Sequence, residues 1–370
     1  MLYRTPGGQV MTLAGNLPFE ERVNMPGLLE NDHIQAGWEL DDLKLGIINS
    51  RKLNVKALVT LKLQAETLFD AEAAEDARFD GDVETLKKTI AVTALSEVLS
   101  LSGNKPDIDT LLWQDIRLRG VNTRPLDGRI RLDGELMVFA IYSGEAGQVP
   151  VQCLEETVPF SGEVELEPSV EEMIPFITVR LVHKELEVNP DSDGEMRELS
   201  VDAVMELDMR LYEEKELEIL NDLYALDREL DMDTGEACFD QIAARNQLKT
   251  RLQEKVDLPV GQRILQICHS DGDVKLDEVQ IRDGELSMDG VLEVQLLYLT
   301  ADDSSPVGAS TEVLPFHMTA QVPGITEDSV YQMEPGLEQI SAVMLGGDSV
   351  EIKASVTMDV LVLNQVCGQV

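Results

Sequence analysis

The sequence predicts an all-β protein made mainly of tandem, sandwich-like units. The first observation behind this prediction is a repeated phrase, RIRLDGELMVFAIY at residues 129–142 and ELSMDGVLEVQLLY at residues 285–298, whose fourteen positions align without a gap. The second is that apolar residues occupy every other position in both phrases, which places them on one face of a strand. A phrase that returns at a fixed spacing indicates that the chain is assembled from copies of one structural unit.

Each phrase has a glycine in the middle of the expected strand, Gly134 after Asp133 and Gly290 after Asp289. A glycine inside a strand indicates a β-bulge or a close approach of another part of the chain. Because the glycine holds the same position in both copies, we expect the same local cause in both.

A Pro-Phe pair follows each phrase, and its phenylalanine, Phe160 or Phe316, lies 18 residues after the tyrosine that ends the phrase. Glycine, aspartate, serine and proline in between are typical of a hairpin turn. A clipped third copy opens the chain, where Leu2-Tyr3 is followed by Pro18-Phe19. Each unit is therefore predicted to contain a hairpin whose second strand ends at Pro-Phe.

A second strand pattern occurs three times, with alternating apolar residues over 53–63, 199–209 and 350–360. Ala57, Ala203 and Ala354 fall at the same step of this pattern. Packed layers interdigitate large with small side chains, so these alanines predict close contact between two sheets.

Short helices and weaker strands complete each unit. Pro106 opens PDIDTLLW (106–113) and Pro259 opens PVGQRILQ (259–266). A proline at a first helical position, with apolar residues one turn later, predicts a short helix in each case. Residues 83–101 and 240–258 fit either an amphipathic helix or a strand. We favour strands, because the edge of a β unit needs a partner.

The chain therefore divides into a partial first unit at 1–82, a second unit at 83–226 and a third at 227–370. Residues 70–82 and 227–237 are acidic and poor in apolar side chains, which indicates linkers. The first unit lacks the short helix and the long first strand, and losing a strand leaves its neighbours with unpaired backbone groups. We therefore expect the chain to be a fragment, or its true start to lie upstream.

Composition disfavours several classes of partner. The 370 residues carry 70 acidic and 30 basic side chains, and the net charge of −40 disfavours nucleic acid and anionic membrane, which both bind positive surfaces. The charge fits a solvated acidic surface or recognition by a basic partner. No apolar run approaches the roughly 20 residues of a membrane-spanning helix. The N-terminus lacks the regions of a signal peptide, so we expect a cytoplasmic protein.

The four cysteines, at positions 153, 238, 268 and 367, are scattered and show no C-x-x-C spacing. In a long cytosolic chain such cysteines are predicted to be reduced thiols. Zinc binding is disfavoured because zinc ligands cluster in the sequence. We predict neither a metal nor another cofactor.

The histidines do not form a known catalytic motif. His33, His183, His269 and His317 lack the H-x-x-x-H and H-E-x-x-H spacings of zinc enzymes. His317 is predicted to lie on the surface, because other residue types take its place in the other copies. Cys268-His269 is disfavoured as a nucleophile and base, because adjacent strand residues point to opposite faces. The sequence therefore predicts no catalytic residue.

Residues 189–200, NPDSDGEMRELS, are similar to the start of a calcium-binding loop, but Ser200 stands where the last ligand should be a glutamate. A hairpin turn at Asp193-Gly194 is the favoured interpretation. No glycine-rich loop carries the lysine and serine that bind phosphate.

The phrases RLDGELMVFAIY and SMDGVLEVQLLY, followed by ETVPF and EVLPF, resemble the SPOCS domain of spore coat assembly proteins, and residues 217–224 are similar to the segment that follows it. The chain resembles the SipL-like members of that family, with two full copies and one partial copy, but without the C-terminal LysM module that many of them carry. The resemblance implies tandem SPOCS units and a non-enzymatic scaffold or adaptor in spore coat assembly. It also implies a protein partner, a SpoIVA-like coat-basement ATPase on the forespore surface in the mother cell.

Two other functions stay open from the residues alone. A carbohydrate- or peptidoglycan-binding module needs a row of exposed aromatic side chains, whereas Trp38 and Trp113 are single and not repeated. An enzyme with a site between units needs a deep pocket with converging polar residues from two units.

Overall fold

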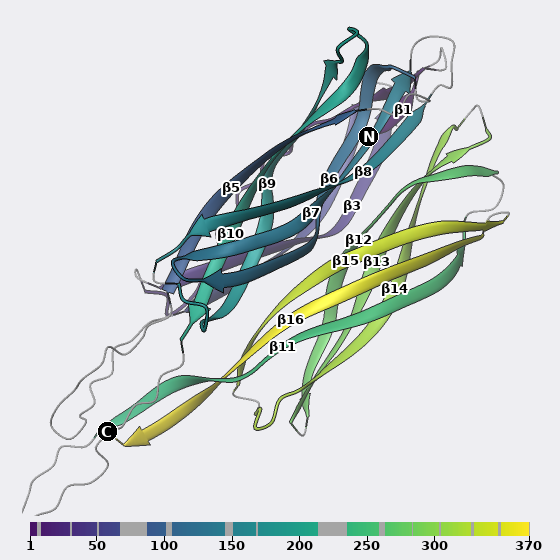
Figure 1. Cartoon of the computed structure of the whole chain (residues 1–370). Coiled ribbons are helices and arrows are strands. Elements are labelled where there is room, and N and C mark those ends of the chain that lie inside the picture. The colour runs from purple at the N-terminus through teal and green to yellow at the C-terminus, as the bar shows by residue number, and fades with distance from the viewer. Residues whose placement is uncertain are drawn as a thin grey trace, which may run out of the picture. The chain divides into compact units, whose positions relative to one another are not determined.

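The structure, a computed structural model, describes residues 1–5, 9–29, 32–49, 52–66, 87–100, 106–144, 151–167, 169–213, 235–258, 263–282, 284–302, 305–326, 329–346 and 349–369. Every regular element in these residues is a β-strand, which confirms the all-β prediction (Figure 1). The chain divides into two compact units, one of Met1–Gly15 with Leu86–Val370 and one of Asn16–Thr85. The boundaries 1–82, 83–226 and 227–370 stay a prediction.

The larger unit contains two six-stranded sandwiches of the same topology. The first consists of β5 (Lys87–Ser100), β6 (Ile108–Leu126), β7 (Arg129–Gly144), β8 (Gln152–Glu165), β9 (Ile174–Pro190) and β10 (Met196–Tyr212). The second consists of β11 (Glu236–Asp257), β12 (Ile264–Arg282), β13 (Glu285–Thr300), β14 (Val307–Gln321), β15 (Val330–Gly346) and β16 (Ser349–Gln369). The sheet orders are β6-β7-β8 with β5-β10-β9, and β12-β13-β14 with β11-β16-β15 (Figure 1).

The two sheets of each sandwich pack face to face through the predicted alternating residues. The repeated phrase forms β7 and β13, and the second strand pattern forms β10 and β16, each the central strand of its antiparallel sheet. Leu136 of β7 and Val201 and Leu207 of β10 are buried in one cluster, and the second sandwich has its own. Each such side chain stabilises the fold by roughly 1.5–3 kcal/mol.

The glycine of the repeated phrase makes room for a phenylalanine ring on the next strand. Gly134 lies opposite Phe160, and Gly290 lies opposite Phe316. A Cβ atom on either glycine would lie 2.7 Å from the Cζ atom of that ring. The predicted close approach is confirmed, and it explains why the Asp-Gly and Pro-Phe motifs occur together. The predicted end of the hairpin is wrong, because β8 and β14 continue beyond Pro-Phe along the central strand.

The short helices predicted at 106–113 and 259–266 are wrong wherever the structure describes them, because β6 and β12 begin there as strands. β-Bulges in β6 interrupt its alternation with β7. As a result Ile108 and Ile116 are buried in the core of the sandwich, whereas Leu112, between them, is buried in a different cluster. Residues 259–262 lie outside the described residues. The preference for strands over 83–101 and 240–258 is confirmed by β5 and β11.

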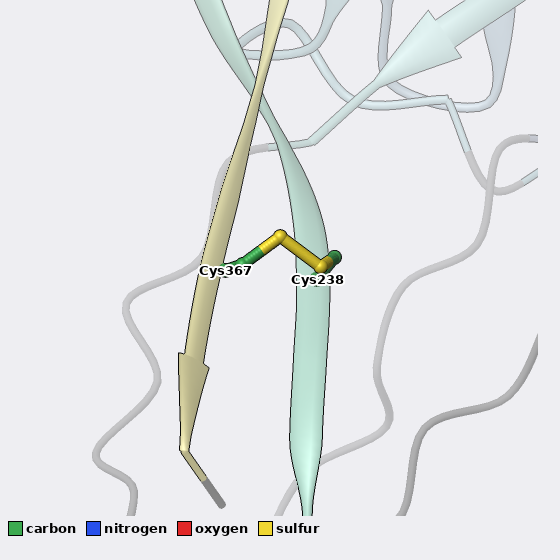
Figure 2. The surroundings of a disulfide bond; sticks show 2 residues. All are labelled: Cys238 and Cys367. Atoms are coloured by element: carbon green, nitrogen blue, oxygen red, sulfur yellow. A yellow bond between two sulfur atoms is a disulfide. The ribbon is translucent and has the colours of Figure 1, made fainter.

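Two cysteines form a disulfide, so the prediction of four reduced thiols is wrong. Cys238 of β11 and Cys367 of β16 lie opposite each other in the antiparallel register, with Cα atoms 4.0 Å apart, and their sulfur atoms are bonded (Figure 2). Strand pairing brings them together although 129 positions separate them in the sequence. Cys153 and Cys268 are buried thiols.

Four strands precede the sandwiches in the sequence. β1 (Leu2–Arg4) pairs with β2 (Val10–Thr12), and β3 (His33–Asn49) pairs with β4 (Lys52–Glu66) in a long hairpin that belongs to the smaller unit. The predicted linker at 70–82, most of the linker at 227–237 and the segment 217–224 lie outside the described residues.

Candidate functional site

The β3–β4 hairpin has one face that is entirely apolar. A β-bulge at Asp41 keeps the apolar positions of β3 in register with those of β4, so that Trp38 lies opposite Leu61 and Leu43 opposite Ala57. We call this surface the hairpin face. It consists of Ile34, Ala36, Trp38, Leu40, Leu43, Leu45 and Ile47 from β3 with Leu53, Val55, Ala57, Val59, Leu61, Leu63 and Ala65 from β4.

Most of the hairpin face is exposed, whereas its counterparts in the sandwiches are buried. Trp38 is 72% and Ile47 is 77% exposed. The corresponding face of β10 is buried under the sheet β6-β7-β8. The predicted close sheet contact is accordingly confirmed at Ala203 and Ala354, which are buried, but is wrong at Ala57, which is exposed. Contiguous apolar patches on a protein surface commonly mark binding sites for other proteins.

The hairpin is also electrically balanced, unlike the rest of the chain. Residues 33–66 carry five lysines and arginines and four aspartates and glutamates, within a chain of net charge −40. Its polar face holds ion pairs such as Lys62–Glu39, at 3.2 Å. Such exposed pairs contribute little to stability. With nearly equal numbers of both signs, the hairpin itself adds little repulsion toward an acidic partner.

A second candidate site is the junction between the two sandwiches. A buried cluster joins Phe139 and Cys153 of the first sandwich to Cys268 of the second. The ring of Phe139 stacks on His269, with centroids 4.2 Å apart and planes 14° apart. The expectation that Cys268 and His269 point to opposite faces is wrong, because a β-bulge between Ile267 and His269 turns both side chains toward this junction.

Charged side chains from both sandwiches also lie in the junction, beside this apolar cluster. The Arg117 Nε atom lies 3.0 Å from Asp115 Oδ2 and 2.7 Å from Asp271 Oδ2. Arg119 also forms an ion pair with Asp271. Lys184 lies 2.6 Å from Asp115. Burial acts to raise the pKa of the Asp115 carboxyl, but Arg117 and Lys184 outweigh it and hold that pKa below its usual value. The half-buried Asp115 carboxylate is therefore kept charged by neighbouring cations.

Three residues of the junction have the composition of a metal site but not its chemistry. Ligand atoms of Asp115, His269 and Asp271 all lie within 4.8 Å of one another. His269 Nδ1 is hydrogen-bonded to Glu155 Oε2 at 2.8 Å, and its buried Nε2 has no hydrogen-bond partner among the described residues. Both carboxylates, however, already hold arginine or lysine side chains. We interpret the group as an ion-pair network, because a metal would have to displace those cations.

Residues at equivalent positions of the two sandwiches meet each other in the junction. In each pair the partners are 156 residues apart, which is also the spacing of the repeated phrases. The rings of Trp113 and His269 have centroids 6.3 Å apart. Arg117 Nη1 lies 3.7 Å from Asp273 Oδ1, and Thr178 Oγ1 donates a hydrogen bond of 3.3 Å to Glu334 Oε2. Contact between equivalent positions defines a pseudo-two-fold arrangement, in which both partners use the same surface.

The other residues singled out from the sequence lie apart from both sites. His317 is exposed, as predicted, and its Nδ1 atom is hydrogen-bonded to Asp289 Oδ1 at 2.8 Å. His183 is exposed beside Glu185, and nothing is described for the side chain of His33. The calcium-loop interpretation gives way to the predicted turn between β9 and β10. There Asp191 Oδ1 accepts backbone N–H groups, and Gly194 has a φ of +86°.

One hollow in the described part of the chain is lined by polar residues, among them Asp127, Arg129 and Glu163, all from the first sandwich. It is not the pocket between two units that an inter-unit enzyme needs. No helix among the described residues is long and apolar enough to cross a membrane.

Comparison with known proteins places the sandwiches in a family. The family model described as SipL, SPOCS domain matches residues 107–189 and 263–345, from β6 into β9 and from β12 into β15. Each matched region lies within one sandwich and is similar to the SPOCS domain of SipL, which confirms the resemblance seen in the sequence. No curated protein and no solved structure matches the chain. The family suggests a role related to sporulation, and it is not a known enzyme family.

Proposed function

We propose that this chain is a non-enzymatic adaptor of spore coat or spore envelope assembly. In this proposal it works in the mother cell, at the forespore surface, and docks onto a SpoIVA-like coat-basement ATPase. The observation that carries the proposal is the exposed hairpin face in a chain that also contains two tandem SPOCS-like sandwiches. The sandwiches have satisfied cores of their own, whereas the hairpin face exposes apolar side chains that binding would remove from water.

The composition of the hairpin face favours protein over sugar as its ligand. Trp38 is the one aromatic residue in that face, and the others are aliphatic. Sugar rings stack on flat aromatic surfaces, whereas aliphatic side chains with a tryptophan anchor are typical of protein interfaces. If the target is polymerised on a surface, many chains bound side by side would gain avidity without new contacts.

The test compares two leucines of similar exposure on opposite faces of the hairpin. Leu43 belongs to the hairpin face and is 54% exposed, while Leu58, opposite Asp42 on the polar face, is 61% exposed. We expect Leu43→Asp to weaken binding of the full chain to the polymerised ATPase at least about tenfold, since an interface leucine replaced by a charge loses more than about 1.4 kcal/mol. Leu58→Asp, the matched control, should stay within about twofold of the parent.

Binding is measured by co-sedimentation with the polymer and by biolayer interferometry with the full chain immobilised. No binding by the parent chain at tens of micromolar, or equal loss in both variants, would refute docking through the hairpin face. Peptidoglycan fragments added to the parent chain should leave Trp38 fluorescence unchanged. A saturable change, lost in Trp38→Ala, would favour the wall-binding alternative instead.

A further inference from the structure

Two thiols from different sandwiches meet inside the junction. Cys153 of β8 and Cys268 of β12 belong to the same buried cluster and are 8% and 7% exposed. The Cys268 thiol is hydrogen-bonded to Cys153. Gln266, on the same strand as Cys268, donates a hydrogen bond from Nε2 to Cys153 Sγ at 3.7 Å. The two sulfur atoms are thus already neighbours in the reduced protein.

The local structure of β12 is what brings Cys268 to this place. The β-bulge next to Ile267 leaves Cys268 without a partner in the ladder to β13, and its side chain packs in the cluster with Phe139. The equivalent positions, 156 residues away, are Leu112 and Ala309, so the pseudo-two-fold arrangement does not produce a second thiol pair. The pair is a single feature on one side of the junction.

We propose that Cys153 and Cys268 form a redox modification site, at which a disulfide ties the two SPOCS sandwiches together. The disulfide between Cys238 and Cys367 lies within the second sandwich and connects strands that are already paired. A bond between Cys153 and Cys268 would instead connect separate sandwiches, so it would fix the junction covalently. This proposal does not depend on the partner or on the hairpin face.

The chemistry requires a two-electron oxidant, and a low-molecular-weight disulfide or a diazene supplies it. One cysteine thiolate attacks the oxidant and forms a mixed adduct. The second thiol then displaces the reduced half, its proton is lost, and the S–S bond forms. Two protons and two electrons leave the protein in total, and they convert a small disulfide into two thiols or a diazene into a hydrazine.

The same contacts determine how fast this reaction should be. The hydrogen bond to Cys153, followed by burial, raises the pKa of the Cys268 thiol. Because the thiolate is the reactive form, oxidation should be slow at neutral pH. It should accelerate by about tenfold per pH unit while the attacking thiol remains mostly protonated.

The test uses the full chain, purified with its native disulfide and treated with the diazene oxidant diamide. Free thiols are then blocked under denaturing conditions, and the chain is digested and mapped by mass spectrometry without reduction. We expect most chains to yield a peptide pair that contains Cys153 and Cys268, two hydrogens lighter than the reduced peptides. A phosphine reductant should abolish this pair, and the Cys238–Cys367 peptide pair serves as the internal reference.

Cys153→Ser and Cys268→Ser should each remove the new peptide pair, whereas Cys238→Ser should leave it in place. The wild-type map remains decisive even if a serine variant fails to fold. The proposal is overturned if both junction thiols are still fully alkylated after diamide treatment at pH 9. It is also overturned if Cys153 or Cys268 pairs instead with Cys238, with Cys367 or with another chain.

Discussion

Replacing the glycine of the repeated phrase by alanine should destabilise each sandwich, and the contacts of each glycine predict which sandwich loses more stability. A methyl group on Gly134 would lie 2.7 and 3.1 Å from the Cζ and Cε1 atoms of the Phe160 ring. Carbon atoms in favourable contact are about 3.5–4.0 Å apart. Phe160 is buried, so its ring cannot swing into solvent. We expect Gly134→Ala to cost about 1–3 kcal/mol, the usual range for overpacking a core.

The second copy should be less tolerant than the first. A methyl group on Gly290 would meet the Phe316 ring at the same 2.7 Å, and in addition the backbone carbonyl oxygen of Lys275. A ring can rotate partly away, whereas a carbonyl held in a strand ladder cannot. Gly290→Ala should therefore lie at the upper end of the range of about 1–3 kcal/mol, or above it.

Gly162, in β8 of the first sandwich, is the matched control. Nothing lies within 4 Å of a methyl group built there, and its backbone is not in the left-handed region. Gly162→Ala should leave stability unchanged or raise it by up to about 1 kcal/mol, because alanine loses less backbone entropy on folding than glycine. The assay is urea unfolding, followed by circular dichroism and by Trp113 fluorescence for the first sandwich.

The reasoning is refuted if Gly134→Ala and Gly162→Ala shift the unfolding midpoint equally. A second check combines Gly134→Ala with Phe160→Leu. If the ring is the obstacle, the double variant should be more stable than the sum of the two single changes predicts.

Further expectations concern the junction, its pH dependence and the disulfide. Exchanging the charges at Arg117 and Asp273 should restore only a minor part of the roughly 2–4 kcal/mol that Arg117→Asp alone costs, because Arg117 also pairs with Asp115 and Asp271; urea unfolding of the single and double variants would show this. Burial, opposed by Arg180 and by the hydrogen bond from Thr178, raises the pKa of Glu334 above its usual 4.5. Its contribution to stability is thus present below pH 4.5 and is lost as pH rises through the raised pKa, so Glu334→Gln should gain stability over the parent in a urea titration at increasing pH. Replacing Cys238 and Cys367 by serine should lower the free energy of unfolding by about 2–4 kcal/mol, and adding a reductant to the parent should give the same value.

The strands were predictable because their signal is local and repeated. In β10 the apolar side chains alternate over most of the strand and burial follows the same alternation, whereas in β7 every residue from Leu136 to Tyr142 is buried. In β6, β-bulges that depend on the pairing with β7 place Ile108 and Ile116 in the core of the sandwich and Leu112 in the junction cluster. Pairing is a property of two strands, so the sequence of β6 alone does not show where its alternation is interrupted.

The junction was missed for a related reason. Arg117 and Asp271 lie on β6 and β12, the strands whose first residues look helical, and nothing local marks their side chains as partners. The signal that could have revealed the junction is the repeat itself, because Arg117 and Asp273 hold equivalent positions and carry opposite charges. Cys238 and Cys367 carry a comparable signal, since each lies at the outer end of a strand that is paired with the other.

The opposite charges at Arg117 and Asp273 bear on which SPOCS units can pair. In a two-fold contact each residue near the axis meets its own equivalent, so two identical copies would place two arginines, or two aspartates, against each other. Here the copies have diverged so that Arg117 meets Asp273 at 3.7 Å and Thr178 meets Glu334. If the third units of two chains paired in this way, Asp273 would face Asp273 and Glu334 would face Glu334. Such contacts between like charges cost several kcal/mol. The divergence therefore selects the pairing of the second unit with the third and disfavours the association of identical units between chains. The surface shared by the two sandwiches is thereby occupied within the chain.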